Sequence, residues 1–252
     1  MIPPMRGTPE RSGGAGPGGP WVGAQAWEDV LFAHWPVPAE HLRPLVPAGL
    51  ELDTFEGRAW IGVVALRIVG SRLRGGPPAS AFPEINVRTY ATAGGLPGVL
   101  FLSLDADSPA MVAVGRHLYG LPYLRARIAV RREGDAVDVR SRRVDRRGPD
   151  AAFEARYRPA GPVAPAAPGS FEWWLVERYR MLSAGRRGAA RRAEVRHPPW
   201  PLQAAEADIA VNTLTRPFGI EPHGEPVLHL ARRVEARFWL PRPAAARPRR
   251  RP

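Results

Sequence analysis

The sequence predicts a mainly β protein of the α+β class, an antiparallel β-barrel with a few peripheral helices. Three observations favour this class. Apolar and polar residues alternate with a period of two through the middle of the chain, strand patterns outnumber helix patterns, and no βαβ alternation or glycine-rich phosphate loop interrupts them. The chain has 252 residues, of which 44% are hydrophobic and 24% charged. This is ordinary globular composition, and the chain is long enough to bury a core.

The central strands are the clearest elements. Ala59 to Val69 is almost continuously apolar, as in a buried strand. In the stretch Glu84 to Thr92 two sides alternate, one with Ile85, Val87 and Ala91 and the other with Glu84, Asn86, Arg88 and Tyr90. A loop from Ala93 to Gly98 separates this strand from a second one, Val99 to Asp105. Two strands joined by a short glycine-rich loop predict an antiparallel hairpin.

A helix follows the hairpin. Ser108 is a good N-cap, Pro109 suits the first helical position, and Gly120 stands where a glycine often ends a helix. The remaining pattern predicts three more antiparallel strands, a helix capped by Ser170, a short third helix and a long final strand. In chain order these are Tyr123 to Arg132, Ala136 to Arg142, Ala151 to Arg158, Ser170 to Ser183, Pro201 to Leu214 and Pro226 to Leu240.

Composition divides the chain into three parts. We expect a disordered leader over residues 1–20, one domain over 21–240, and a disordered basic tail over 241–252 that holds five arginines. The formal net charge is +12. No helix-turn-helix or RNP motif accompanies this charge, so we expect no specific nucleic-acid partner and only weak, salt-sensitive contact with polyanions through the tail.

Several chemistries are excluded by composition. The chain has no cysteine, and all 36 of its basic residues are arginine. Disulfides, thiolate nucleophiles and lysine Schiff bases are therefore ruled out. The six histidines show no metal-ligand spacing, so we expect no metal and no cofactor. No apolar run approaches the roughly 20 residues of a membrane span and no signal peptide is evident, which favours a cytoplasmic protein without a membrane partner.

The hairpin carries the most informative polar pattern. If Thr92 pairs with Val99, five polar side chains share one face of two adjacent strands. They are Glu84, Asn86, Arg88, Ser103 and Asp105. Such a face can be exposed to solvent, or it can line the lumen of a small barrel that holds one ligand. The sequence leaves both interpretations open.

A second motif carries a family resemblance. The stretch Gly115-Arg116-His117-Leu118-Tyr119-Gly120-Leu121-Pro122-Tyr123 resembles the active-site segment of acetoacetate decarboxylases, in which the Schiff-base lysine directly follows the proline. Over a longer span, about Trp27 to Leu240, the chain resembles the YqjF-like family, domain of unknown function DUF2071. The matching segments are Glu84-Ile85-Asn86-Val87-Arg88-Thr89-Tyr90, Phe101-Leu102-Ser103-Leu104-Asp105, Leu121-Pro122-Tyr123, Glu177-Arg178-Tyr179 and His197-Pro198-Pro199-Trp200-Pro201-Leu202.

This resemblance implies an acetoacetate-decarboxylase-like β-barrel with a cavity bordered by the motif segments, and it implies no known reaction. The departure from the decarboxylase motif is informative. Tyr123 stands at the Schiff-base lysine position and Leu124 at the next, also a lysine in the decarboxylase. Tyrosine cannot form an imine, and the guanidinium of arginine stays protonated, so decarboxylation through a Schiff base is excluded.

The remaining polar residues suit an anionic ligand. Six of them are ligand-binding candidates: Asn86, Arg88, Ser103, Asp105, Arg116 and His197. Tyr123 and Glu84 are candidate catalytic residues, with Tyr123 offering a hydroxyl and Glu84 or Asp105 an acid or base. The structural alternatives are an ion pair for Arg116, a packed ring for His197, a hydrogen-bonded tyrosine at Tyr123, and an ion pair tying the Glu177-Arg178-Tyr179 segment to the barrel.

Three functions are consistent with these residues. The first is a protein that binds a small anionic or carbonyl-bearing metabolite in a barrel cavity without Schiff-base chemistry. The second is a lysine-independent lyase or hydrolase-like enzyme that uses Tyr123, Glu84 and Arg88. The third is an interaction protein that uses its basic tail. The sequence identifies neither the ligand nor the oligomeric state.

Overall fold

The computed structural model describes residues 19–184 and 189–244. The expected leader and most of the expected basic tail lie outside these residues. Its strands are β1 (Gly23–Val37), β2 (Glu51–Leu52), β3 (Ala59–Leu73), β4 (Phe82–Ala93), β5 (Leu96–Ala106), β6 (Tyr123–Glu133), β7 (Ala136–Arg143), β8 (Ala152–Pro159), β9 (Arg180–Ala184), β10 (Ala190–Arg196), β11 (Leu202–Asn212), β12 (Val227–Phe238) and β13 (Arg242–Pro243). Its helices are α1 (Ala39–Leu42), η1 (Arg43–Leu45), α2 (Pro109–Val114), the π-helical η2 (Gly115–Tyr119), α3 (Phe171–Val176) and η4 (Arg216–Phe218).

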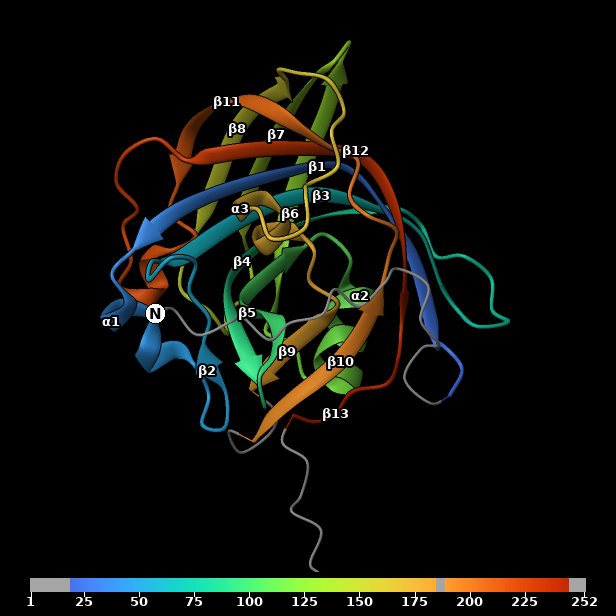
Figure 1. Cartoon of the computed structure of the whole chain (residues 1–252). Helices are drawn as coiled ribbons and strands as arrows, with labels where there is room; N and C mark the ends of the chain where they lie inside the picture. Colours follow the sequence, from blue (N-terminus) through green and yellow to red (C-terminus); the bar gives the residue numbers. More distant parts are fainter. Residues whose placement is uncertain (1–18, 185–188, 245–252) are drawn as a thin grey trace, which may run out of the picture.

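The described strands form one sheet of 13 strands, ordered β13-β10-β9-β5-β6-β7-β8-β11-β12-β1-β3-β4-β2, with further β10–β12 and β4–β5 pairings. In Figure 1 the long strands β1, β3 and β12 curve across the molecule, with β7 and β8 at the top of the view and β9, β10 and α2 at the bottom. The mainly β prediction is confirmed, but the expectation of a purely antiparallel sheet is wrong. β5 pairs in parallel with both β6 and β9. A parallel pair needs a crossover connection, and α2 with η2 supplies the one between β5 and β6.

The β4–β5 hairpin exists, but its register differs from the predicted one. The turn consists of Gly94 and Gly95 alone, both with positive φ (58° and 76°), as a two-residue hairpin turn requires. Thr92 therefore pairs with Pro97 instead of Val99, and a bulge between Val87 and Arg88 shifts the pairing again. Asn86 ends opposite Leu104, one residue from the predicted partner. A shift of one residue moves side chains to the opposite face of a strand.

Three other elements differ from the sequence predictions. Residues 23–37 form β1, for which no strand was predicted. The predicted helix from Ser170 ends at Val176, and β9 follows it. The predicted short helix from Pro201 is instead the strand β11, whose residues alternate between exposed and partly buried along its length. Pairing with β8 and β12 stabilises β11 as a strand and overrides the helix propensity of its alanines.

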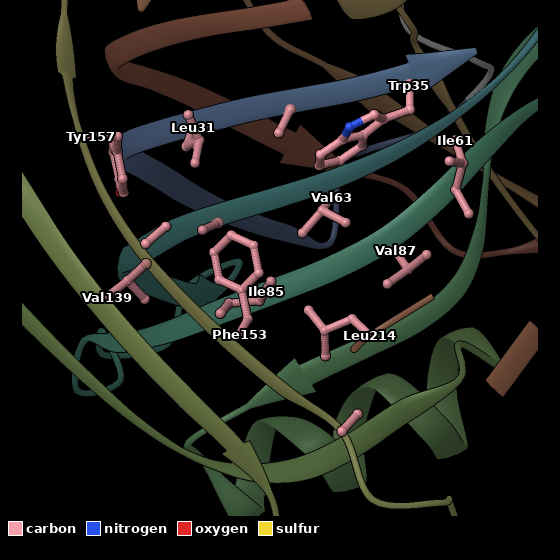
Figure 2. Close-up of a cluster of buried hydrophobic side chains, with 14 of the residues drawn as sticks. Leu31, Trp35, Ile61, Val63, Ile85, Val87, Val139, Phe153, Tyr157 and Leu214 are labelled. Carbon is pink, nitrogen blue, oxygen red and sulfur yellow. The ribbon is translucent and has the colours of Figure 1, made fainter. Parts of the chain in front are cut away.

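One face of the sheet is filled by hydrophobic side chains. Figure 2 shows that residues from β1, β3 and β4 point toward residues from β7 and β8, with Leu214 beside them. Val63, Ile85, Val139 and Phe153 are all buried in this cluster. This face is therefore packed by aliphatic and aromatic groups. In the described part of the chain, no helix is both long and apolar enough to span a membrane.

Candidate functional site

The opposite face of β1, β3 and β4 borders a cavity of about 690 Å³. A volume of this size is within the range of small-molecule binding sites. Strands β1, β3, β4 and β5 supply most of its wall, α2 with η2 supplies another part, and single residues of β6, β9, β12 and the connecting segments complete it. The lining is predominantly apolar and includes Trp27, Val30, Phe32, Val64, Leu66, Ile68, Phe101, Leu104, Met111, Leu121, Met181, Trp200 and Phe238.

A row of three polar side chains runs along the cavity wall. Glu84, Asn86 and Arg88 are alternate residues of β4 and face the cavity together, and all three are buried. The alternative interpretation, in which this polar face of β4 is exposed to solvent, is therefore wrong. Alternation makes this arrangement possible, because Ile85 and Val87 between them point into the hydrophobic cluster on the other face. β4 thus separates a packed core from a cavity.

Glu84 and Tyr123 form the closest polar contact in the cavity. The Tyr123 hydroxyl donates a hydrogen bond of 2.6 Å to Oε2 of Glu84, and Nδ2 of Asn86 donates one of 3.4 Å to Oε1. Burial raises the pKa of Glu84 from 4.5 to about 7, although both hydrogen bonds lower it and the charge of Asp105 adds to the rise. Burial and the neighbouring Glu84 also raise the pKa of Tyr123 well above its usual value. Glu84 therefore exchanges a proton near neutral pH while Tyr123 stays protonated.

Arg88 is a buried cation without an ion-pair partner in the described residues. Its side chain lines the cavity, and its Nε and Nη2 atoms make no hydrogen bond to any described residue. The guanidinium lies over two aromatic rings, 5.2 Å from the centroid of Phe32 and 5.9 Å from that of Tyr90. Cation–π contacts stabilise it only in part, because two buried N–H donors remain unsatisfied. An anion would satisfy them.

A buried pair of side chains supports the ring beneath Arg88. The hydroxyl of Tyr90 and Nε2 of His34 are 2.7 Å apart, and both residues are fully buried. Burial lowers the pKa of His34 well below its usual value, and the charge of Arg88 lowers it further. Gly62 allows this packing, because a Cβ there would lie 2.7 Å from the His34 ring. A neutral histidine therefore holds Tyr90 in place without adding a second positive charge.

A glycine also permits the position of Tyr123. A Cβ at Gly115 would lie 2.3 Å from Cδ2 of the Tyr123 ring, which is closer than any real contact. The predicted ends of this helical segment are confirmed. Ser108 is the N-cap, because its hydroxyl accepts a hydrogen bond from the Met111 backbone N–H, and Gly120 ends the segment with a φ of 65°. Because Gly115 has no side chain, η2 packs directly against the Tyr123 ring.

Ser103 and Asp105 do not join the polar row. They project from the other face of β5, where Nη2 of Arg143 lies 3.0 Å from Oδ1 of Asp105 and 3.4 Å from the hydroxyl of Ser103. The Arg143 and Asp105 side chains are 1% and 0% exposed. The expectation that they share a face with Glu84 is wrong, because the bulge shifts the register by one residue and places Ser103 opposite Val87 and Asp105 opposite Ile85. They tie β5 to β7 in the protein interior.

Arg116 also points away from the cavity lining. Its Nε donates a hydrogen bond of 2.7 Å to the backbone oxygen of Tyr123, and its Nη2 forms an ion pair with Asp145. Burial acts to raise the pKa of Asp145, but hydrogen bonds from Arg125, Arg116 and Arg147 together lower it to about 2. This ion pair is the structural alternative foreseen for Arg116, and it fixes the strand that carries Tyr123.

His197 lies among aromatic rings outside this cavity. Its ring stacks on Tyr179 with centroids 4.8 Å apart, and its Nδ1 lies 2.8 Å from the Pro198 carbonyl oxygen. It borders a separate groove that is shared with Arg237 and Trp239. In the neighbouring segment Arg178 forms an ion pair with Asp53, and the Tyr179 hydroxyl donates a hydrogen bond to Glu177. This segment therefore connects the end of α3 to other parts of the fold.

The sequence prediction missed the apolar half of the site. Trp27 and Phe32 come from β1, for which no strand was predicted. Trp200 comes from the segment just before β11, which was predicted as a short helix. A period-two pattern in β1 is obscured because residues 30–35 are buried on both faces. Within the described ranges, no group of three or more His, Cys, Asp or Glu residues is arranged to hold a metal ion.

Two sequence comparisons identify relatives of this chain. The model of the family DUF2071, described as an uncharacterized conserved protein, matches residues 24–235. The uncharacterized protein YqjF of Bacillus subtilis (strain 168) is 44% identical over 227 residues, which cover 88% of this chain and 93% of YqjF. Both matches include β4, α2 and the Tyr123 segment.

Solved structures show the same fold at low sequence identity. The enduracididine biosynthesis enzyme MppR complexed with pyruvate superposes with a TM-score of 0.62 at 14% identity, covering 90% of this chain and 91% of MppR. Acetoacetate decarboxylase from Legionella pneumophila subsp. pneumophila str. Philadelphia 1 gives a TM-score of 0.61 at 13% identity, covering 86% of each chain. An acetoacetate decarboxylase-like enzyme from Sphingomonas wittichii RW1 gives 0.59 at 16% identity, covering 86% of this chain and 91% of that one. These similarities concern the fold alone.

Proposed function

The chain belongs to the DUF2071 family of uncharacterized conserved proteins, and from this premise we propose that it binds a small organic carboxylate in the cavity beside β4. Arg88 holds the carboxylate, while Glu84 and Tyr123 contact a carbonyl or hydroxyl group of the same ligand. Binding needs no Schiff base, since the chain contains no lysine.

The buried guanidinium of Arg88, whose Nε and Nη2 find no hydrogen-bond partner among the described residues, is the observation that carries this proposal. Nε and Nη2 lie on the same edge of an arginine side chain, and such a pair of donors matches the two oxygens of a carboxylate. Both atoms of Arg88 are buried and unsatisfied. MppR, which has the same fold, forms a complex with pyruvate, a carboxylate with an adjacent carbonyl group. That complex supports the same ligand class for this chain.

The strand pairings support a barrel-like wall around the ligand. Among the strands that the structure describes, β1, β3, β4, β5, β9, β10 and β12 form a continuous series of pairs that returns to its start through β10–β12. Four of these strands, β1, β3, β4 and β5, supply most of the lining, and Phe238 of β12 and Met181 of β9 add to it. We therefore assign the cavity to the inside of this closed series of strands. The hydrophobic cluster of Figure 2 lies on the opposite face of β1, β3 and β4, the strands that border both the cluster and the cavity.

Calorimetric titration tests the proposal. We expect pyruvate and hexanoate to bind the wild-type chain, and Arg88→Met to weaken both at least tenfold, because the methionine keeps the apolar stem and removes the charge. Arg127→Met is the matched control, since Arg127 is an exposed arginine of β6 outside the cavity lining. Equal affinities in the wild type and Arg88→Met, or failure of the wild type to bind any carboxylate, would overturn the proposal.

A second function is favoured by the contact between Tyr123 and Glu84. A buried carboxyl group with a pKa of about 7 suits general acid–base chemistry, and the tyrosine hydroxyl can donate a hydrogen bond to a developing enolate. We propose that ionised Glu84 removes a proton next to a carbonyl group, which leaves an enolate, and that protonated Glu84 then returns the proton to the enolate carbon. This enolisation is the proton transfer on which a lysine-independent lyase could be built. Exchange of the methyl protons of pyruvate in deuterated water, followed by proton NMR, tests this step. Loss of exchange in Glu84→Gln supports it, and exchange no faster than in buffer rejects it.

A further inference from the structure

We propose that the physiological ligand is an amphipathic carboxylic acid with an extended hydrocarbon body, bound with its carboxylate inward and its hydrocarbon chain directed toward the cavity mouth. This inference rests on the proposed carboxylate site at Arg88 and names the chemical class that the rest of the cavity selects. It concerns the apolar wall, which the proposed function does not use.

The cavity is far too large and too apolar for a three-carbon acid. A volume of about 690 Å³ is typical of sites that surround a ligand of many heavy atoms. Aromatic and aliphatic side chains cover the wall on several sides, among them Trp27, Phe32, Leu66 and Phe101. Buried polar side chains line it on β4, with Tyr123 beside them, and a second polar group, Gln25, Ser71 and Arg72, lies near the ends of β1 and β3. A pyruvate molecule at Arg88 would leave most of this apolar wall without a contact.

Polarity changes along the length of the cavity. Arg88, Asn86 and Glu84 are 8%, 5% and 4% exposed and form its buried end. At the mouth the lining includes exposed apolar side chains beside the solvent-exposed Arg72: Leu73 at the end of β3 is 61% exposed, and Val114 of α2 and Leu118 of η2 are 39% and 37% exposed. Exposed apolar side chains at the rim of a cavity favour an apolar ligand segment that continues out to them.

The strand β3 gives the length of this apolar path. Gly62 lies opposite Arg88 in the β3–β4 ladder, and Leu66 lies opposite Glu84, where the polar row of β4 ends. Beyond Leu66 the β3 wall continues with Ile68, which faces the same cavity. At about 3.3 Å per residue, the distance from Gly62 to Ile68 is about 20 Å. An extended chain attached to a carboxylate at Arg88 would follow this wall.

A series of saturated acids tests the inference on the full chain. Sodium propionate, hexanoate, octanoate and decanoate are titrated below their micellar concentrations, with intrinsic tryptophan fluorescence as the signal, to which Trp27 and Trp200 in the cavity wall contribute. We expect the affinity to increase about three- to fourfold for each added methylene group that is buried. 1-Decanol, which has the same chain without the charge, should bind at least tenfold more weakly than decanoate.

A variant at the cavity mouth distinguishes a hydrocarbon chain bound inside the cavity from nonspecific adsorption to the protein surface. Ala113 lines the cavity from α2, whereas Ala110 on the same helix is exposed and does not line it. Ala113→Trp should weaken decanoate at least tenfold and leave propionate within twofold, while Ala110→Trp should change neither, with both variants melting as the wild type does.

The outcomes distinguish this inference from the proposed function. If the short and long acids bind through Arg88 with equal affinity, the hydrocarbon chain is not recognised and only this inference is overturned. If decanol binds as tightly as decanoate, or if Arg88→Met leaves the whole series unchanged, the carboxylate site itself is wrong. Binding of decanoate that Ala113→Trp does not weaken would place the chain elsewhere and reject the inference.

Discussion

The hydroxyl of Tyr123 donates a 2.6 Å hydrogen bond to Glu84 across an intervening strand, because β5 lies between β4, which carries Glu84, and β6, which carries Tyr123. The two residues are 39 positions apart in sequence. This bond connects the polar row of β4 to the segment that resembles the decarboxylase motif. At the position where that motif has a lysine amine, this chain therefore presents a tyrosine hydroxyl paired with a protonatable carboxyl group.

The raised pKa of Glu84 predicts a specific dependence of stability on pH. The folded state binds a proton at Glu84 up to a pKa of about 7, whereas the carboxyl group of the unfolded chain loses it near 4.5. A raised pKa stabilises the fold when the group is protonated, and this stabilisation is lost as the pH rises toward 7. Relative to Glu84→Gln, the wild-type free energy of unfolding should therefore fall by about 2–3 kcal/mol between pH 5 and pH 8.

Urea unfolding of both proteins at the two pH values measures this difference. The glutamine variant keeps the size of the side chain and removes its titration, so effects of pH on other groups cancel in the comparison. A difference between the two proteins that does not change with pH would show that Glu84 titrates at its ordinary pKa.

Gly115 predicts how tightly Tyr123 is held. A Cβ at this position would overlap the tyrosine ring at 2.3 Å, so Gly115→Ala should displace the ring, break its hydrogen bond to Glu84 and destabilise the fold by about 1–3 kcal/mol. Gly161→Ala is the control, since a Cβ there would meet Ala204 at an ordinary 3.6 Å. Thermal unfolding compares the two variants, and tyrosine side-chain NMR follows the Tyr123 hydroxyl. A Gly115→Ala variant as stable as Gly161→Ala would mean that η2 can move away from the ring.

The buried pair of Arg143 and Asp105 predicts a strong structural effect without a binding effect. Asp105→Asn leaves the guanidinium of Arg143 buried without its counter-charge, and such a change costs about 3–5 kcal/mol. Replacing both residues, as in Asp105→Leu with Arg143→Met, should recover much of this loss because neither charge remains. Urea unfolding measures the stabilities of the single and double variants, and hexanoate titration should show unchanged affinity in the folded variants. A marked loss of affinity in the double variant would return Asp105 to the ligand site.

The absence of lysine predicts that no covalent adduct forms in the cavity. Incubation with acetoacetate and borohydride should leave the mass of the folded domain unchanged, since an imine needs a primary amine and only the chain's N-terminus offers one. Mass spectrometry of the peptides separates the two locations. An adduct on any peptide other than the first would contradict the assignment.

Much of the candidate site could be predicted from local pattern. Strict alternation over Glu84, Asn86 and Arg88 placed them on one face, and the punctuation at Ser108, Pro109 and Gly120 is confirmed. The expectation that Ser103 and Asp105 share this face was wrong because a bulge shifts the register by one residue, whereas the two-residue turn shifts it by two and leaves the face unchanged. The Gly94-Gly95 pair is a signal that could have indicated the turn, but no local signal indicates the bulge.

By itself, the sequence determined the mainly β class, the polar row of β4, the family resemblance and the exclusion of lysine chemistry, because each follows from residue type and spacing along the chain. Only the tertiary structure decided that this row faces a cavity, that Arg116 and Asp105 are engaged in ion pairs, and that Arg88 has no ion-pair partner within residues 19–184 and 189–244. The physical reason is that these outcomes depend on partners far away in sequence. Asp145, Arg143 and Tyr123 reach their positions only when strands separated by tens of residues pair in one sheet.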